Sequence, residues 1–338
     1  MRGVTIKDIA KASGVSVTTV SRVINQKPDV NPETRKRVEE VMATHRFVVN
    51  DYARSLKQLE RDVVAVILRG HRNAFFNTLS EAILDRAGDT NAHYLLTYID
   101  ERADEFQEAI RLITQKRVGG VIFVGSRIDD RSRQLADVAC PMVFVTVNAE
   151  NSCLPHVSSV SIDDRKMGQQ VAEALLERGH RKIAVFGGSP VEGDSLSQRY
   201  QGVLDAYLNH GLHYDPSRYV ETRFSYHGAY DAARALFTSK PDTTAAFAMS
   251  DIVAMGVIRA LQDLGKKVPQ DVSVIGFDGI EATGFYSPRI ATVEQPVEQI
   301  ADAAVQVLGD MMVQRTRPRH VTVQANLVLR ESLGEPPK

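Results

Sequence analysis

The sequence predicts an all-α helix-turn-helix head followed by an α/β body of two doubly wound parallel-sheet lobes. Near the N-terminus, apolar side chains recur at helical spacing and are interrupted by glycine and by capping residues. From residue 62 onward, apolar runs of strand length alternate with amphipathic stretches of helical length, in two successive rounds. The length of 338 residues accommodates two or three domains at roughly 100–200 residues each.

Composition and charge narrow the classes of protein that need to be considered. With 43% hydrophobic and 25% charged residues, the chain has the composition of a globular protein. Residues 1–60 carry 11 Lys and Arg against 7 Asp and Glu, whereas the remaining residues carry 30 against 35. A basic head on an acidic body is consistent with nucleic-acid binding by the head.

Cysteine usage and the N-terminus predict a reduced protein of the cytoplasm. Cys140 and Cys153 are too few for a disulfide framework and lack zinc-site spacing, so we expect small reduced core residues and no metal. The first residues lack the apolar core of a signal peptide, and no apolar run approaches the roughly 18 residues of a membrane span. We therefore expect a chain that is neither exported nor anchored in a membrane.

The head is predicted to contain three helices. Thr5 is positioned to cap the first helix, and Gly14 supplies a residue at its end for which positive φ costs little. Ser16 caps a second helix, and a third begins at Asn31 with Pro32 at its first position. The predicted buried side chains of the three helices recur at helical spacing; they are Ile6, Ile9, Ala10, Val20, Val23, Ile24, Val38, Val41 and Met42.

Two short helices joined by a turn that contains glycine, with a third closing the core, form a helix-turn-helix unit. The start of the second helix enters the major groove in such units, and here Val17, Thr18 and Arg22 face outward. Arg22 can donate two hydrogen bonds to guanine, while Val17 and Thr18 can touch thymine methyls. The residues expected on phosphates are Thr5, Ser16, Thr19, Ser21 and Asn25. From pattern alone, a three-helix bundle whose polar residues merely face solvent remains an alternative.

Residues 5–25, TIKDIAKASGVSVTTVSRVIN, resemble the N-terminal motif of the lactose-repressor (LacI/GalR) family of transcriptional regulators. The resemblance continues through the body, in segments 73–76, 179–184, 250–256, 268–278, 292–296 and 329–332. It implies a sequence-specific DNA-binding regulator rather than an enzyme, with a body that binds a small-molecule effector.

Segment 47–57 is similar to the family's hinge, although Val49 stands where the family usually has proline. Residues 51–57 are fewer than the roughly 12–15 that an isolated helix needs in water, so we expect order only with a partner hinge and DNA. The resemblance places Leu56 as a wedge between base pairs in the minor groove. The hinge residues expected on DNA are Ala53, Leu56 and Lys57.

The body should fold as two parallel sheets covered by helices on both faces. The apolar runs predict strands at 63–68, 94–99, 120–124 and 142–147 in the first lobe, and at 182–187, 245–249 and 272–277 in the second. Segments 292–296 and 321–330 are expected to cross between lobes. The predicted domains are a head of residues 1–48, a hinge of 49–61, a first lobe of 62–161 plus 293–321, and a second lobe of 162–292 plus 322–335.

Ligands of doubly wound folds bind beyond the carboxyl ends of the strands. Candidate effector-binding residues near such ends are Phe75, Phe76, Ser195, Arg199, Phe224, Ser250, Asp251 and Asp278. A carboxylate and a guanidinium can bind vicinal hydroxyls, and an aromatic ring can cover the C–H face of a sugar. Two alternatives stay open: Phe75 and Phe76 could be core residues, and Asp251 could simply cap its helix.

The resemblance implies that Asp278 and Arg199 bind the effector. Gly193 and Ser195 replace the arginine and threonine of purine-responsive relatives, which favours a saccharide. The family pattern further implies a homodimer that represses carbohydrate-use genes from a palindromic operator and is released when the effector closes the lobes. A corepressor-dependent or purine-type regulator is the nearest alternative.

Two other classes of function are disfavoured by the sequence. A protein that only binds sugar, like the periplasmic proteins whose lobes the body resembles, would leave the basic head without a purpose. An enzyme or a cofactor-binding protein would need a motif such as a nucleophile elbow, a zinc-binding His pair, a phosphate-binding loop or a dinucleotide fingerprint. None of these motifs is present.

Overall fold

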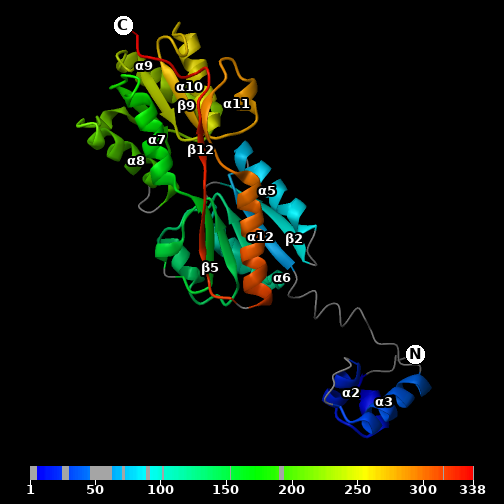
Figure 1. The fold of residues 1–338 in the computed structure, drawn as a ribbon. Helices are drawn as coiled ribbons and strands as arrows, with labels where there is room; N and C mark the ends of the chain where they lie inside the picture. The colour runs from blue at the N-terminus through cyan, green and yellow to red at the C-terminus, as the bar shows by residue number, and fades with distance from the viewer. Residues whose placement is uncertain are drawn as a thin grey trace. The chain divides into compact units, whose positions relative to one another are not determined.

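The computed structural model describes residues 6–24, 30–45, 63–70, 73–88, 92–100, 103–152, 154–189, 194–314 and 316–337. The chain divides into two compact units, Met1–Leu59 and Glu60–Lys338 (Figure 1). Within the described residues, no helix combines the length and the apolar character that a membrane crossing requires.

The head contains three helices, α1 (Ile6–Ser13), α2 (Val17–Ile24) and α3 (Pro32–Thr44). Gly14 ends α1 with φ of +66°, and Ser16 caps α2 by accepting a hydrogen bond from the Thr19 amide at 3.1 Å. The side chain of Asn31 accepts from the Glu33 amide at 2.9 Å, with Pro32 as the first residue of α3. These predicted helix boundaries are confirmed, while the proposed cap Thr5 lies outside the described residues.

A small apolar core joins the three helices of the head. Ile9 from α1, Val20 from α2 and Val38 from α3 are fully buried, and Val41 and Met42 pack against them. The buried stripe of α2 leaves its opposite side exposed, and this arrangement is the helix-turn-helix unit that the sequence predicted.

The first sheet of the body consists of six parallel strands in the order β11-β5-β4-β3-β1-β2. Its strands are β1 (Val63–Arg69), β2 (His93–Ile99), β3 (Gly120–Val124), β4 (Met142–Val145), β5 (Val157–Ile162) and β11 (His320–Val323). The four strands predicted for this lobe are confirmed, with small changes at their ends. Cys140, just before β4, is a buried free thiol, as expected, and burial raises its pKa to about 12. Cys153 lies outside the described residues.

Strand β5 was not predicted, because three serines interrupt its apolar pattern. The structure buries all six of its residues. Ser158 Oγ accepts a hydrogen bond from the Arg319 amide at 3.0 Å, and Ser159 Oγ accepts one from the Ala149 amide at 3.0 Å. These bonds satisfy the hydroxyls inside the sheet, so polar side chains are tolerated at central positions.

The second sheet has the order β12-β10-β9-β8-β6-β7, and its pairs are parallel except for β10 with β12. Its strands are β6 (Ile183–Gly187), β7 (Tyr219–Glu221), β8 (Ala245–Ala248), β9 (Ser273–Asp278), β10 (Ala291–Glu294) and β12 (Asn326–Val328). In both sheets the chain winds outward in two directions from the first strand. The doubly wound architecture of the two lobes is therefore confirmed.

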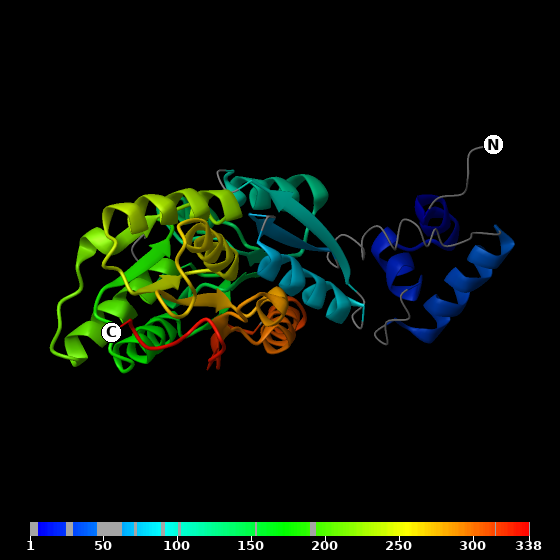
Figure 2. The same cartoon turned by 90° about the horizontal axis from the view of Figure 1, so that it is seen from above.

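Helices cover both faces of each sheet (Figures 1 and 2). In the first lobe, α5 and α12 pack side by side on one face, and α6 and η1 pack on the other. In the second lobe, α7 and α8 cover one face and α9 and α10 the other. The bounds are α5 (Ala74–Ala87), α6 (Glu105–Lys116), η1 (Asp130–Leu135), η2 (Glu150–Ser152), α7 (Asp164–Leu176), α8 (Ser195–Asn209), η3 (Pro216–Arg218), α9 (Tyr226–Ser239), α10 (Asp251–Asp263), α11 (Ala282–Phe285) and α12 (Val297–Val313).

The chain crosses between the lobes three times: after β5, after β10 and after β11. Strand β10 stays in the second sheet as far as Glu294, and β11 stays in the first as far as Val323. The last two crossings therefore lie slightly C-terminal to the boundaries expected at 293 and 322. The two lobes are therefore joined by three segments of chain.

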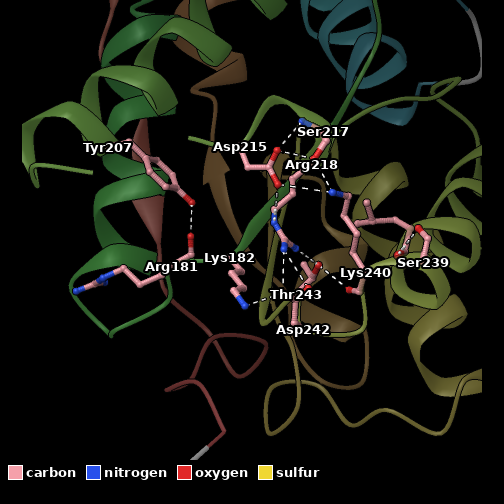
Figure 3. Close-up of polar contacts among 11 residues, drawn as sticks. Arg181, Lys182, Tyr207, Asp215, Ser217, Arg218, Ser239, Lys240, Asp242 and Thr243 are labelled. Carbon is pink, nitrogen blue, oxygen red and sulfur yellow. Dashed lines mark hydrogen bonds and ion pairs between the residues drawn. The ribbon is translucent and has the colours of Figure 1, made fainter. Parts of the chain in front are cut away.

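An ion-pair network joins the ends of the second sheet that lie away from the carboxyl edge (Figure 3). Arg218, which is buried, donates to Thr243 Oγ1 at 2.5 Å and to Asp242 at 3.0 Å, and lies 3.4 Å from Asp215. Lys182 reaches Asp242 at 2.6 Å. Hydrogen bonds from Lys182 and Arg218 lower the pKa of Asp242 to about 2. The network ties the segment before β7 to the start of β8.

Candidate functional site

The outward side of α2 carries the side chains predicted to read DNA. Val17, Thr18 and Arg22 are exposed, opposite the buried Val20 and Val23. Thr18 and Arg22 are four residues apart and so lie on the same face of the helix. This placement suits contact with base edges in a major groove.

Three of the predicted phosphate contacts lie just before α2 or within it. Ser16 and Thr19 exchange a hydrogen bond between their hydroxyls at 2.9 Å, and Ser21 is half-buried on the following turn. The remaining predicted DNA contacts, Thr5, Asn25, Ala53, Leu56 and Lys57, lie outside the described residues, and all of these contacts remain predictions.

A cavity of about 320 Å³ lies between the two lobes. Its first-lobe walls follow β1, β3 and β4, and its second-lobe walls follow β6, β7, β8, β9 and β10 at their carboxyl ends. The ends of β1 and β3, and of β6 and β8, are the switch points of the two sheets, where chain segments diverge and leave room for a ligand. The volume is at the lower end of the roughly 300–1,000 Å³ of small-molecule sites.

Backbone conformation at the cavity is unusual. Gly70 and Gly125 have φ of +79° and +74°, and the lining residues Thr146 and Asp278 have φ of +74° and +117° despite carrying side chains. Such conformations cost about 1–3 kcal/mol for residues other than glycine and concentrate at functional sites. A Cβ at position 125 would lie 2.6 Å from the ring of Phe76, so glycine allows that ring to reach the cavity.

Asp278 ends β9 and presents a buried carboxylate to the cavity. It accepts hydrogen bonds from Ser250 Oγ at 2.9 Å and from Gln295 Nε2 at 3.0 Å. Burial raises its pKa and Arg199 opposes that rise, while the charge of Asp278 contributes to raising the pKa of the buried Asp251 carboxyl. The group is therefore held by donors but poorly solvated, which suits an acceptor for ligand hydroxyls.

Arg199 on α8 is held on three sides. Its Nε donates to Asp164 Oδ1 at 2.8 Å, its Nη1 donates to the Met249 carbonyl at 2.9 Å, and the guanidinium lies 3.5 Å over the Phe277 ring. Burial raises the pKa of Asp164 to about 6, although the guanidinium of Arg199 acts to lower it. A Cβ at Gly168 would lie 2.1 Å from the Arg199 carbonyl oxygen. Glycine therefore lets α7 and α8 approach closely enough to set the position of Arg199.

The structure brings five of the eight predicted effector residues to the cavity and places three elsewhere. Those that line it are Phe76, Ser195, Arg199, Phe224 and Asp278. Phe75 does not line the cavity. It packs in the core between α5 and the sheet, which agrees with the alternative that it is a core residue. Ser250 lies behind the wall and donates to Asp278.

Asp251 neither caps α10 nor lines the cavity. Ser250 occupies the cap position, and the Asp251 carboxylate accepts hydrogen bonds from the amides of Gly279 and Ile280 at 2.7 and 2.9 Å. The Thr292 hydroxyl donates to it at 2.6 Å. Asp251 thus fixes the loop that follows Asp278, a role that neither alternative anticipated.

Several lining residues were missed by sequence reasoning. They are Arg69, Asn73, Ser126, Arg127, Asp194, Arg223 and Gln295. Arg69, Arg127, Arg223 and Gln295 lie at or within three residues of the end of a strand. A polar residue at or just beyond the end of a strand is the signal that these four share, whereas the predicted residues were aromatic or belonged to segments that resemble the family. Among the described residues, no group of histidine, cysteine and carboxylate side chains is arranged to hold a metal ion.

A helix-turn-helix head joined to a two-lobed α/β body with a cavity at its switch points defines a class: transcription regulators that carry a small-molecule-binding body. Residues 5–50 match bacterial regulatory proteins of the lacI family, and residues 172–333 match a periplasmic binding protein-like domain. The regulator MalR of Clostridium butyricum is 32% identical over 331 residues, which cover 97% of this chain and 98% of MalR. The chain belongs to the LacI family of transcriptional regulators and is not an enzyme.

Solved structures agree with this assignment. A complex of the transcriptional regulator CelR with cellobiose has a TM-score of 0.73 at 27% identity, and the match covers 98% of this chain and 100% of CelR. The Lac repressor dimer bound to operator and the anti-inducer ONPF has a TM-score of 0.73 at 24% identity, covering 98% and 99%, and shares the fold.

Proposed function

We propose that this protein is a homodimeric repressor of carbohydrate-use genes, released from a palindromic operator when a saccharide closes the two lobes of the body. The observation that carries the proposal is the inter-lobe cavity, where Asp278 and Arg199 face a ligand from one lobe and Phe76 from the other. Residues of both lobes line one cavity, so a bound molecule would bridge them.

The chemistry of the cavity suits a sugar. The Asp278 carboxylate accepts hydrogen bonds from hydroxyls, while the rings of Phe76 and Phe224 offer apolar surface to C–H groups. Ser195, at the position where purine-responsive relatives differ, lines the same space. The similarity to a CelR–cellobiose complex supports a saccharide over a purine.

Exposed apolar side chains on both lobes support a dimer. Leu95 and Tyr98 on the edge strand β2 are 38% and 56% exposed, and Tyr226 and Phe285 in the second lobe are 55% and 84% exposed. Exposed apolar side chains on both lobes are suited to contact with a second copy of the chain. A two-fold dimer would present two heads, which matches the two half-sites of a palindromic operator.

The regulatory step follows from that arrangement. Lobe closure would change how the first lobes of a dimer meet, and with them the separation of the two hinge segments. Hinges held apart could not order on DNA, so operator affinity would fall by a coupling free energy of about 1–3 kcal/mol. The predicted intercalation of Leu56 belongs to this step.

The proposal is tested by operator binding of the full chain. The operator is first selected from a random duplex library, and affinity is then measured by fluorescence anisotropy with and without sugars. Arg22→Gln should weaken binding to the selected operator by about 1–3 kcal/mol, since a bidentate base contact is lost, and affect unrelated DNA far less. Equal losses on both DNAs would contradict a reading role for α2. Tighter operator binding with sugar would identify a corepressor instead of an inducer.

A further inference from the structure

The inter-lobe cavity is unusually rich in guanidinium groups. Of the described lining residues, four are arginines and two are aspartates. Arg69 and Arg127 enter from the first lobe, whereas Arg199 and Arg223 enter from the second. Ligands without charge need few such groups, because hydroxyls can be bound by amides and carboxylates at a lower desolvation cost.

Two of the four arginines are matched by carboxylates behind the wall. Arg199 pairs with Asp164 at 2.8 Å, and Arg69 lies 3.6 Å from Glu105, which is fully buried. In each of these pairs the two charges offset each other, so a structural role in the wall of the cavity is enough to explain them.

The other two arginines are more accessible to a ligand. The side chain of Arg127 is 32% exposed, against 12% for Arg69 and 7% for Arg199, and Arg223 is exposed as well. Arg127 forms a long ion pair with Asp194 at 3.9 Å, without a hydrogen bond, and Asp194 also caps α8 by accepting from the Ser197 amide at 2.7 Å. Within the described part of the chain, no ion pair or hydrogen bond joins the Arg223 guanidinium to a carboxylate. Both guanidiniums therefore retain donors for a ligand.

Arg127 and Phe224, the neighbour of Arg223, meet across the cavity. A Cβ at Gly188 would lie 3.2 Å from the Phe224 ring and 3.5 Å from Arg127 Nη2, so these two side chains converge from different lobes. Ser126 precedes Arg127, lines the cavity, and has a buried Oγ without a hydrogen-bond partner among the described residues. Asp278, Gln295 and Arg199 form a separate polar group suited to hydroxyls.

We infer that the effector is an anionic saccharide whose phosphate or carboxylate group binds Arg127 and Arg223, while its hydroxyls bind Asp278. Guanidinium groups bind both anions through paired N–H donors, more strongly than they bind neutral acceptors. An anion shared by a first-lobe and a second-lobe arginine holds the lobes closed, and Arg127 exchanges its loose contact with Asp194 for the ligand. The inference rests on the proposed function, because it assigns the chemical class of the same effector.

Isothermal titration calorimetry on the full chain tests this inference. The probes are the 6-phosphates and uronates of glucose, galactose and mannose, the three parent hexoses, cellobiose, maltose and inorganic phosphate. At least one anionic sugar should bind tenfold or more tightly than its parent hexose and than inorganic phosphate. The phosphate and uronate arms distinguish the two sources of negative charge.

Substitutions then locate the anion. Arg127→Gln and Arg223→Gln should each reduce the ratio of anionic to neutral affinity at least tenfold, whereas Arg133→Gln, on an exposed surface arginine, should leave it unchanged. The inference is overturned if neutral sugars bind as tightly as their anionic derivatives, or if neither cavity substitution changes that ratio.

The same titrations, repeated with operator DNA present, separate this inference from the proposed function. A neutral sugar that binds and releases the operator, with no anionic sugar binding, would refute the anionic class and leave the proposed function standing. An anionic sugar that binds through Arg127 and Arg223 without changing operator affinity would uphold the class and refute the proposed release.

Discussion

Replacing Asp278 by asparagine should make the body more stable at neutral pH while impairing ligand binding. Because burial raises the pKa of Asp278, the folded protein holds a proton at pH values where the unfolded chain has lost it. Stability from this group is therefore largest below the unfolded pKa of about 3.9 and falls as the pH rises through the raised folded value. At pH 7.5 the wild-type protein carries the full penalty of a charged, buried carboxylate, and Asp278→Asn removes that penalty.

The magnitude follows from the surroundings of the carboxylate. Each unit by which the pKa is raised corresponds to about 1.4 kcal/mol. Asparagine can still accept from Gln295 and meet the Ser250 hydroxyl, and Arg199 keeps its bonds to Asp164 and Met249. We expect a gain of about 1–3 kcal/mol at pH 7.5, which in a domain of this size raises Tm by about 2–4 °C per kcal/mol.

Thermal unfolding of the full chain at pH 5.0 and pH 7.5 measures this effect. The stabilisation by Asp278→Asn should be large at pH 7.5 and smaller at pH 5.0, and Asp231→Asn, at an exposed position on α9, should show neither change. The same variant should bind the effector about 10–100-fold more weakly, since charge-assisted hydrogen bonds to hydroxyls are lost. A lower Tm at pH 7.5, or an equal shift at both pH values, would refute the reasoning.

Three further predictions concern packing, the ion-pair network and the hinge. Gly168→Ala should lower Tm and weaken effector binding, because a Cβ there meets the Arg199 backbone. Gly309→Ala on α12, where an added Cβ would contact no neighbouring element within 4 Å, should raise stability by about 0.4–1 kcal/mol in the same melts. Arg218→Ala should lower the free energy of unfolding, measured by calorimetry, by about 2 kcal/mol. The loss is smaller than for a fully buried ion pair because Asp215 and Asp242 are half-exposed. A variant as stable as the wild type would argue against a stabilising role of the network. Leu56→Ala should weaken selected-operator binding in anisotropy assays far more than binding to unrelated DNA; equal losses would exclude the wedge.

The fold could be predicted from the sequence because the spacing of apolar residues distinguishes its helices from its strands. Apolar runs located seven strands, and glycine, serine and asparagine located the boundaries of the head helices at Gly14, Ser16 and Asn31. Strand β5 escaped because its serines are satisfied by partners distant in the chain, such as Arg319, and no local pattern reveals such partners.

The candidate site was only partly accessible from the sequence. Asp278 and Arg199 were found through their resemblance to known effector residues, and both line the cavity. Phe75 and Phe76 are adjacent and chemically identical, so only the direction of each side chain on α5 separates a core residue from a cavity residue. The role of Asp251 depends on the Gly279 and Ile280 amides of a loop in another part of the chain, which the sequence does not place beside it.

The cavity arginines are site residues that the sequence did not identify. Arg127 and Arg223 lie in unremarkable loops nearly a hundred residues apart, and their shared cavity exists only once both sheets have formed. Whether an arginine is accessible to a ligand depends on its surroundings in three dimensions, such as those that leave the Arg127 side chain 32% exposed beside Asp194. The chemical class of the effector could therefore be inferred only from the structure.

The most direct test of the regulatory account is the affinity of the full chain for its selected operator, measured by anisotropy across the panel of neutral and anionic sugars. A coupling of about 1–3 kcal/mol predicts that one of these sugars weakens operator binding roughly 5–150-fold, and that the operator weakens sugar binding by the same factor. An unchanged operator affinity in the presence of a sugar that saturates the cavity would contradict control of the head by the body.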